Sequence, residues 1–380
     1  MAYITDSILN APRSGIRKLM ELSAAMDGPV VHCEVGEPQF DTPAHIVEAA
    51  CQALRDGYTK YNPNAGLPEL RAAIAKAKSK DLGIPLTMDN IMIGIGGVEI
   101  LQAVMRAFMD PGDEILMPDP YWPNYIGMCA TYTLKPVLYK LLPENGFYPD
   151  MEELEKLVTP KTKMILVNSP SNPLGIVFPK EVMEKLVDFA DRHDIVLLSD
   201  EAYEKMVFDC EMFNPQMLGM RKNVIAAHTL SKTYSMTGWR VGYMIAHEDV
   251  VNDMFKMQEN YISCVPTALQ KASVAAVEGP QDCADMMRNA YKEHRDVVAN
   301  ILKPAGIQFL VPTGAFYMWV NAETEDSDEF CVDFLMKERV AVAPGSTFGP
   351  SGQGWIRISL ASSAEDLAEC AKRLVRFMGK

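Results

Sequence analysis

The chain has 380 residues, of which 48% are hydrophobic and 23% are charged, a composition typical of a water-soluble globular protein with a large core. Its 36 basic and 50 acidic residues give a formal net charge of −14, which argues against a surface that binds nucleic-acid backbones. The eight cysteines form no CxxC pair, so they predict neither a zinc site nor a disulfide framework.

The first residues, MAYITDSILN, contain no basic segment followed by an apolar run, so no signal peptide is predicted. No apolar stretch approaches the roughly 20 residues that a membrane-spanning helix needs. The cysteines are expected to be reduced thiols. We therefore predict a cytoplasmic protein with neither a membrane nor a nucleic acid as its partner.

In the middle of the chain, short apolar runs alternate with helical patterns. Within the runs apolar and polar residues hardly alternate, which is typical of strands that are buried on both faces. Strands separated by helices form a mostly parallel sheet through right-handed crossovers, so an α/β fold is predicted. The predicted strands are 91–96, 114–120, 163–170, 195–202 and 224–231, and the predicted helices include 98–110 and 181–193.

The pattern changes after about residue 280, where residues 282–302 predict one long amphipathic helix. Shorter elements follow, and the polar stretch 323–329 is expected to begin a helix. We predict three parts of the chain. Residues 1–40 form an N-terminal arm with one clear helix and part of a small domain, residues 41–285 form a large cofactor-binding domain, and residues 286–380 complete the small domain.

Polar residues that could take part in catalysis or ligand binding lie at the ends of three of the predicted strands. Asn172 follows the strand 163–170, Asp200 closes the strand at 195–200 and leads into EAY, and Lys232 follows the strand 224–231. In open α/β sheets ligands bind at the carboxyl ends of the strands, so these residues are expected to meet at one edge.

A pyridine aldehyde cofactor needs this set of residues. The amine of Lys232 can form an imine with the aldehyde, be displaced by a substrate amine and then move a proton. The carboxylate of Asp200 can keep the ring nitrogen protonated, so that the ring accepts electrons from a substrate carbanion. Asn172 and Tyr203 can hydrogen-bond the ring oxygen.

A phosphate on that cofactor needs a cradle of its own. The segment GIGG (94–97) lies between a strand and a helix, where backbone N–H groups and the helix dipole face an anion. Taken alone, each of the candidate site residues is more typical of a turn, a helix cap, the core or a surface ion pair. The segment SKTYSMTGWR (231–240) is the exception, because its pattern is not typical of an exposed surface. The candidates are the N–H groups of Gly97 and Val98, the hydroxyls of Thr229 and Ser231, the guanidinium of Arg240 and, for stacking on the ring, Trp122.

These residues lie in motifs that resemble a known family from APRSGIRKL near the start to WIRISLASS (355–363) near the end. Between them lie VGEPQFDTP, TKYNPNAGLPELRAAI, PGDEILMPDPYWPNY, NSPSNPLGIV, LSDEAYEKMVF, TLSKTYSMTGWRVGY and PTGAFYMWV. The chain resembles the class I and II aminotransferases of fold type I, within the aspartate, aromatic and alanine aminotransferase-like group. The resemblance implies pyridoxal 5′-phosphate and a mostly parallel seven-stranded sheet, with a smaller α+β domain formed by both chain ends.

The resemblance also implies roles for individual residues. Lys232 resembles the lysine of the internal aldimine, Asp200 the partner of the pyridine nitrogen, and Trp122 the ring-stacking residue. Asn172 and Tyr203 resemble the partners of the ring oxygen. Three further residues have implied roles: Arg357 binds the substrate α-carboxylate, the main chain at Gly36 lies against the substrate, and Tyr61 reaches the cofactor phosphate of a neighbouring subunit. The protein is therefore expected to be an obligate homodimer with shared active sites.

The chain also departs from the family pattern. Thr229 replaces a common serine but keeps the hydroxyl, and Val98 stands where some aspartate-specific relatives carry a lysine. The segment NYISCVPT (260–267) offers no arginine for a second substrate carboxylate either. Arg13 and Arg17 remain as candidates, although the helical pattern favours a surface position for Arg17.

Two enzyme functions fit these motifs. The first is an aminotransferase that moves an amino group from an L-amino acid to a 2-oxo acid by a ping-pong mechanism. The alternative is a carbon–sulfur β-lyase, which needs the same lysine, aspartate and arginine. A ligand-sensing module fused to a DNA-binding head is disfavoured, because only about 35 residues precede VGEP. The preferred amino donor stays open.

Overall fold

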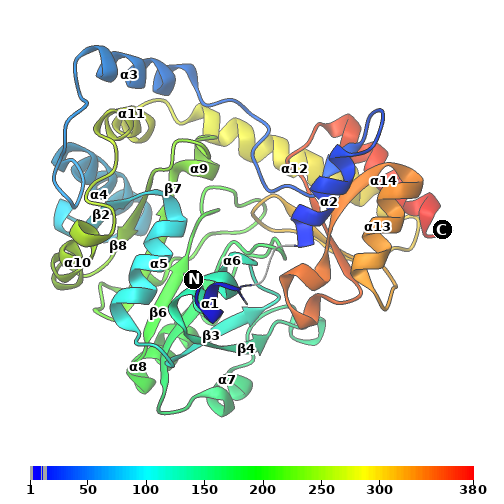
Figure 1. Cartoon of the computed structure of the whole chain (residues 1–380), viewed down its shortest axis with the longest axis horizontal. Helices are drawn as coiled ribbons and strands as arrows, with labels where there is room; N and C mark the ends of the chain where they lie inside the picture. Colours follow the sequence, from blue (N-terminus) through cyan, green and yellow to red (C-terminus); the bar gives the residue numbers. More distant parts are fainter. Residues whose placement is uncertain (1–2, 10, 12–14) are drawn as a thin grey trace.

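The computed structural model describes residues 3–9, 11 and 15–380 of the chain. Two β-sheets organise these residues: a seven-stranded sheet from the middle of the chain and a five-stranded sheet to which both chain ends contribute. In Figure 1 the larger sheet and its helices occupy the left and centre, and the smaller unit, with α2, α13 and α14, lies at the right.

The large sheet has the strand order β2-β8-β7-β6-β5-β3-β4. All pairs are parallel except those of β8, which runs antiparallel to both β2 and β7. The mostly parallel seven-stranded sheet is therefore confirmed. Its strands are β2 (Ile91–Gly94), β3 (Glu114–Asp119), β4 (Lys135–Lys140), β5 (Thr162–Asn168), β6 (Val196–Asp200), β7 (Val224–Thr229) and β8 (Gly242–Ile245).

Helices cover both faces of this sheet, which explains the uniformly apolar strands. In β5, Met164 and Leu166 face a core with α5, α6 and α10, whereas Ile165 and Val167 face a core with α7 and α8. At the β2–β8 end the second face is covered by α3, α4 and α11. The helices are α3 (Ala44–Arg55), α4 (Pro68–Leu82), α5 (Gly96–Phe108), α6 (Asn124–Tyr132), α7 (Met151–Leu157), α8 (Lys180–His193), α9 (Leu230–Thr233), α10 (Glu248–Tyr261) and α11 (Thr267–Glu278).

The small sheet has the order β1-β11-β12-β10-β9, and only the pair β1–β11 is parallel. One apolar core joins it to four helices, α2, α12, α13 and α14. This confirms that both chain ends build the smaller unit; the boundaries after residues 40 and 285 stay predictions. Its elements are β1 (Val31–Cys33), β9 (Phe309–Leu310), β10 (Tyr317–Asn321), β11 (Val340–Pro344), β12 (Trp355–Ser359), α2 (Gly15–Ala24), α12 (Asp282–Leu302), α13 (Ser327–Glu338) and α14 (Ala364–Phe377).

The predicted elements agree with the structure within a few residues, and α12 has the predicted bounds. The helix expected from the polar stretch 323–329 is α13, whose N-cap Asp326 accepts a hydrogen bond from the backbone of Glu329. The short elements without a strong periodic signal are α1 (Asp6–Leu9) and the 3₁₀ turns η1 (Met88–Asn90), η2 (Pro143–Asn145), η3 (Pro215–Leu218), η4 (Gly345–Phe348) and η5 (Pro350–Gly352).

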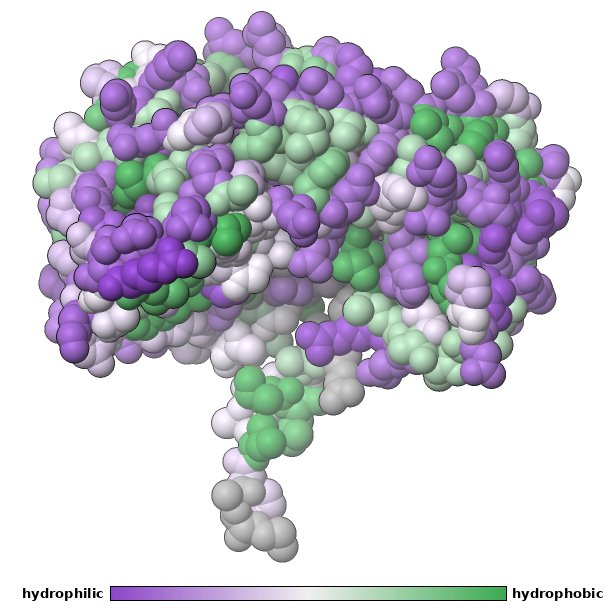
Figure 2. All heavy atoms as spheres, turned by 90° about the horizontal axis from the view of Figure 1, so that it is seen from above, coloured by the Kyte–Doolittle hydropathy of each residue, from purple (hydrophilic) through white to green (hydrophobic). Residues whose placement is uncertain are grey.

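The N-terminal segment that carries α1 projects from the body of the protein, and its surface is largely apolar (Figure 2). Four of its side chains are exposed: Tyr3, Ile4, Ile8 and Leu9. Within the described residues, no helix is both long and apolar enough to cross a membrane.

Candidate active site

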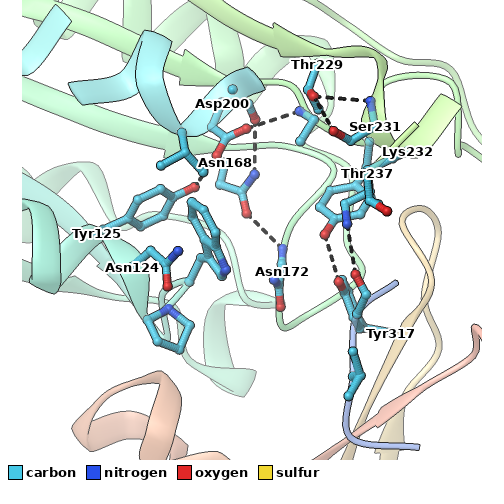
Figure 3. Close-up of a pocket in the computed structure, with 18 of the residues that line it drawn as sticks. Asn124, Tyr125, Asn168, Asn172, Asp200, Thr229, Ser231, Lys232, Thr237 and Tyr317 are labelled. Atoms are coloured by element: carbon cyan, nitrogen blue, oxygen red, sulfur yellow. Dashed lines mark hydrogen bonds between the residues drawn. The ribbon is translucent and has the colours of Figure 1, made fainter. Parts of the chain in front are cut away.

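A cavity of about 390 Å³ opens at the carboxyl ends of the large-sheet strands, and residues of the small unit form its other wall (Figure 3). Every predicted site residue except Tyr61 lines it: Gly36, Gly97, Val98, Trp122, Asn172, Asp200, Tyr203, Thr229, Ser231, Lys232, Arg240 and Arg357. Tyr61 is 92% exposed and lies outside this cavity. Arg13 lies outside the described residues, whereas Arg17 is exposed and also lines the cavity.

Lys232 lies in α9, a single helical turn directly after β7. The hydroxyl of Thr229 caps this turn by accepting a hydrogen bond from the backbone N–H of Ser231. The Lys232 Nζ donates a hydrogen bond to the carbonyl of Gly36 at 2.8 Å. Burial lowers the pKa of Lys232 to about 8, and the positive charges of Arg357 and Arg240 act in the same direction. A neutral, nucleophilic amine is therefore accessible near neutral pH.

Asp200 ends β6 with a buried carboxylate. Burial raises its pKa, whereas a hydrogen bond from the Tyr125 hydroxyl, 2.6 Å from Oδ2, lowers it. The backbone N–H of Ala202 donates to Oδ1 at 3.1 Å. The carboxylate is thus held in one orientation at the cavity, which suits a partner for a protonated ring nitrogen.

Sequence reasoning missed Tyr125 and Asn168, which both line the cavity and are labelled in Figure 3. Asn168 donates a hydrogen bond to the Asp200 carbonyl and accepts one from the backbone N–H of Asn172. Its position at the carboxyl end of β5 was a usable signal, because Asp200 was identified from the same position in β6. Tyr125 gave no such signal.

Arg357, on β12 of the small sheet, is buried and lines the cavity. Its guanidinium donates to Asn172 Oδ1 at 2.8 Å and to the Glu34 carbonyl at 2.6 Å, but Nε has no partner among the described residues. The rings of Tyr317 and Phe348 lie 4.3 and 4.8 Å from the guanidinium carbon. A buried guanidinium that lines a cavity is suited to bind a carboxylate.

The start of α5 forms a backbone cradle next to β8. Gly96 has φ +73°, and a Cβ there would lie 2.6 Å from the Arg240 guanidinium. A Cβ on Gly242 would lie 2.8 Å from the backbone nitrogen of Gly97. Glycines therefore permit the close approach of α5, β8 and Arg240.

This cradle fits a phosphate group. The positive end of the α5 dipole and its free N–H groups lie beside Arg240 and the Thr229 hydroxyl. Thr229 Oγ1 and Ser231 Oγ are 2.9 Å apart, so both hydroxyls can serve one anion. With the adjacent lysine, aspartate and Trp122, the donor set fits a phosphorylated pyridine aldehyde.

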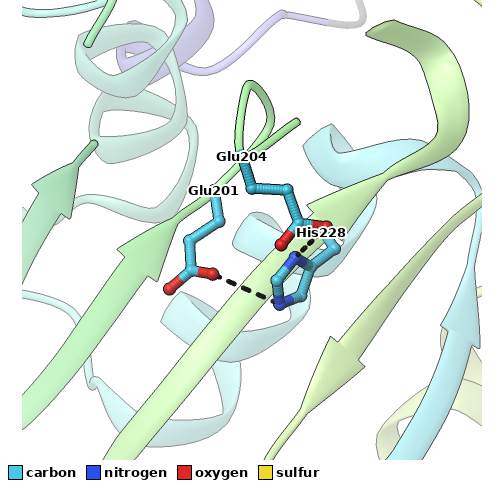
Figure 4. Close-up of side chains that lie close together, drawn as sticks. All are labelled: Glu201, Glu204 and His228. Carbon is cyan, nitrogen blue, oxygen red and sulfur yellow. Dashed lines mark ion pairs between the residues drawn. The ribbon is translucent and has the colours of Figure 1, made fainter. Parts of the chain in front are cut away.

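A second polar cluster, formed by the buried Glu201 and His228 and the partly buried Glu204, lies outside the cavity lining (Figure 4). His228 Nε2 is 3.6 Å from Glu201, its Nδ1 is 3.4 Å from Glu204, and Lys78 forms an ion pair with Glu204. Burial raises the pKa of Glu201 to about 8 and lowers the pKa of His228 to about 4. At neutral pH Glu201 therefore holds a proton and His228 is neutral.

Comparison with known proteins gives a consistent result over the whole chain. The family model "Aminotransferase class I and II" matches residues 29–374. An "Aspartate aminotransferase" of Pyrococcus horikoshii is 37% identical, over 99% of this chain and 97% of its own length. An "Aromatic-amino-acid aminotransferase 2" of Thermococcus litoralis is 36% identical, over 99% of this chain and 98% of its own.

Solved structures agree with these sequence matches. A structure described as aspartate aminotransferase from Thermus thermophilus with maleate superposes with a TM-score of 0.93 at 33% identity. The match covers 99% of this chain and all of that chain.

Proposed function

The chain belongs to the aminotransferase class I and II family and is an aminotransferase, and from that premise we propose that it binds pyridoxal 5′-phosphate at Lys232. We further propose that it moves an amino group from an L-amino acid to a 2-oxo acid by ping-pong exchange. The observation that supports this proposal most strongly is the meeting of Lys232, Asp200 and Arg357 in one cavity, because the three come from different elements, α9, β6 and β12, of both units.

The bound cofactor supplies an electron sink for the electron pair that the substrate α-carbon keeps when it loses its proton. Lys232, with its lowered pKa, acts as the nucleophile and as the base that carries this proton. Asp200 keeps the ring nitrogen protonated. Arg357 binds the substrate α-carboxylate, while the main chain at Gly36 lies against the substrate; both residues line the cavity.

The remaining predicted residues hold the cofactor in this proposal. The N–H groups of Gly97 and Val98, the hydroxyls of Thr229 and Ser231, and the Arg240 guanidinium bind the phosphate. Asn172 and Tyr203 donate hydrogen bonds to the ring oxygen. The indole of Trp122 stacks on the ring and keeps water from it.

We also propose that the protein is a homodimer in which Tyr61 of each subunit reaches the phosphate bound by the other. Two observations support a dimer: Tyr61 is 92% exposed, and the projecting segment around α1 exposes several apolar side chains. The proposed cytoplasmic location is supported by all eight cysteines being free thiols.

A half-reaction tests the function directly. The purified protein, loaded with pyridoxal 5′-phosphate, is mixed with single L-amino acids in the absence of a 2-oxo acid, and the cofactor absorbance is followed. We propose aspartate and the aromatic amino acids as the first donors, because relatives carry the names of both activities. A change of the cofactor spectrum with at least one common amino acid, reversed by a 2-oxo acid, supports the proposal; no change with any of them contradicts it.

The β-lyase alternative is tested with cystathionine. Release of pyruvate without an amino acceptor, at a rate above that of amino transfer, would assign the lyase reaction as the main activity. The names of the relatives favour transfer.

A further inference from the structure

A buried carboxyl group, that of Glu99, lies at the start of α5 beside the phosphate cradle but outside the cavity lining. Its side chain is only 7% exposed. Oε2 accepts a hydrogen bond at 3.0 Å from the backbone N–H of Ile95, the N-cap residue of α5. Gly94 leaves room for this contact, because a Cβ there would collide with Oε2. The carboxyl group therefore folds back onto the positive end of the helix.

Two neighbouring buried oxygens have no hydrogen-bond donor among the described residues: Oε1 of Glu99 and Oε1 of Gln258 on α10. The Gln258 amide is held in its orientation because its Nε2 donates to the Ile93 carbonyl at 2.8 Å. Turned round, it would place its own oxygen against that carbonyl. A proton on Glu99 Oε1 satisfies both unpartnered oxygens at once, because the neutral acid then donates to Gln258. Burial raises the pKa of Glu99 to about 7, although the Ile95 N–H lowers it, so this proton is present near neutral pH.

The elements packed against α5 offer Glu99 few charged neighbours. Strand β2 has no titratable side chain, and β7 and β8 turn His228 and Tyr243 to the opposite face of the sheet, where the two rings stack. Tyr132 of α6 and Tyr261 of α10 present hydroxyl groups that hydrogen-bond to each other. The charged groups are those of the cavity and exposed residues of α5 and α10: Asp200, Lys232, Arg240, Arg106, Glu248, Asp249, Asp253, Lys256 and Glu259. An anion bound at the start of α5 would share the positive helix end with Glu99 directly.

We propose that Glu99 is a positioning residue of the phosphate cradle: as a neutral acid bonded to Gln258, it fixes the first turn of α5 without placing a second negative charge beside the cofactor phosphate. This proposal rests on the proposed binding of pyridoxal 5′-phosphate. A phosphate and an ionised Glu99 would compete for the same end of one helix dipole. By linkage, loss of the Glu99 proton weakens phosphate binding, and a bound phosphate holds the proton on Glu99.

The test measures equilibrium binding of pyridoxamine 5′-phosphate and of pyridoxamine to the full-length protein, stripped of cofactor, from pH 6 to pH 9. Neither ligand can form an imine with Lys232, and they differ only in the phosphate, so the ratio of their Kd values reports the phosphate contribution. In the wild-type protein this contribution should fall on the order of tenfold as the pH rises above about 7. The second ionisation of the phosphate itself, at a pKa of about 6, acts in the opposite direction and is the same for every variant.

Glu99→Gln is the deciding variant, because an amide reproduces the neutral acid: its oxygen accepts from Ile95 and its nitrogen donates to Gln258. It should match the wild-type protein near pH 6 and show no fall above pH 7, so that near pH 9 it binds the phosphate ester about tenfold more tightly. Glu259→Gln is the matched control, since it removes an exposed carboxylate next to Gln258 and should keep the fall. The same fall in Glu99→Gln, or its loss in Glu259→Gln, would overturn the assignment of Glu99.

Proton uptake gives a second readout in the wild-type protein alone. At pH 8 the free phosphate ester has already lost its second proton, so any extra proton taken up on binding belongs to the protein. Calorimetry in buffers of different ionisation enthalpy should show more uptake with pyridoxamine 5′-phosphate than with pyridoxamine, and equal uptake would contradict the proposal. Failure of the proposed cofactor binding would instead show as no binding of pyridoxamine 5′-phosphate to the wild-type protein at any pH.

Discussion

The hydroxyl of Tyr125 offers a sharp test of how Asp200 is tuned. Its Oη lies 2.6 Å from Asp200 Oδ2, and both side chains are buried. Tyr125→Phe removes this donor and leaves the ring in place. A hydrogen bond to a buried charged group contributes about 1.5 to 3 kcal/mol. The ionised carboxylate of Asp200 loses that stabilisation, whereas its neutral form loses much less.

The sign of the effect follows from the two opposing influences on Asp200. Burial raises its pKa and the Tyr125 hydrogen bond lowers it, so removing the hydroxyl raises the pKa further. Since about 1.4 kcal/mol corresponds to one pKa unit, the acidic limb of the pH profile should move upward by about one to two pH units. Activity would then be lost at a higher pH than in the wild-type protein.

The assay is kcat/KM for one amino donor from pH 5 to pH 9 with saturating cofactor. Tyr139→Phe is the matched control, because Tyr139 is equally buried but donates to the neutral Leu166 carbonyl at 2.8 Å. Both variants should lose some stability, and only Tyr125→Phe should move the acidic limb. An unchanged acidic limb in Tyr125→Phe, or an equal movement in the control, would refute the reasoning about Asp200.

Three further predictions follow from described contacts. Lys232→Ala should bind the cofactor without a borohydride-trappable bond, and mass spectrometry that finds another lysine labelled in the wild-type protein would refute the assignment. Gly36→Ala should raise KM by about tenfold or more, because a Cβ would collide with the Tyr317 hydroxyl. An unchanged KM would contradict this prediction, because it would show that Tyr317 moves to make room for the Cβ. The usual pKa values are 4.5 for Glu201 and 6.5 for His228, so between about pH 6.5 and 8 this pair holds one proton more in the folded protein than in the unfolded chain. The pair should therefore lower the free energy of unfolding by up to about 2 kcal/mol as the pH rises through that window, and Glu201→Gln should remove this contribution in urea titrations, most clearly above pH 7, where Glu99 no longer contributes.

Much of the fold was predictable because burial on both faces leaves a strong pattern in the sequence. The β5 and β6 strands are apolar runs, and two polar residues, Asn172 shortly after β5 and Asp200 at the end of β6, were found by their position. The strands β4 and β8 were not singled out. Strand β4 lies at the sheet edge, is partly exposed and contains Pro136, and β8 has only four residues.

Apart from Asn168, the missed site residues act through contacts that no local sequence pattern encodes. Tyr125 reaches Asp200 on β6 from the helix α6, and Tyr317 on β10 of the small sheet forms a hydrogen bond with Tyr203 at 2.7 Å. The pairing of Glu201 with His228 arises because β6 and β7 are neighbours in the large sheet. Such roles depend on the packing of distant segments, so they become visible only in three dimensions.

The bond between Arg357 and the Glu34 carbonyl joins residues 323 positions apart in the chain. A ribosome that has made the large sheet has therefore not yet supplied Arg357, and β1 still lacks its partner β11. The phosphate cradle can form on a nascent chain, whereas the substrate carboxylate site must wait for the last strands. Because closing so long a loop is slow, newly made protein should acquire cofactor affinity before it acquires the ability to bind substrate.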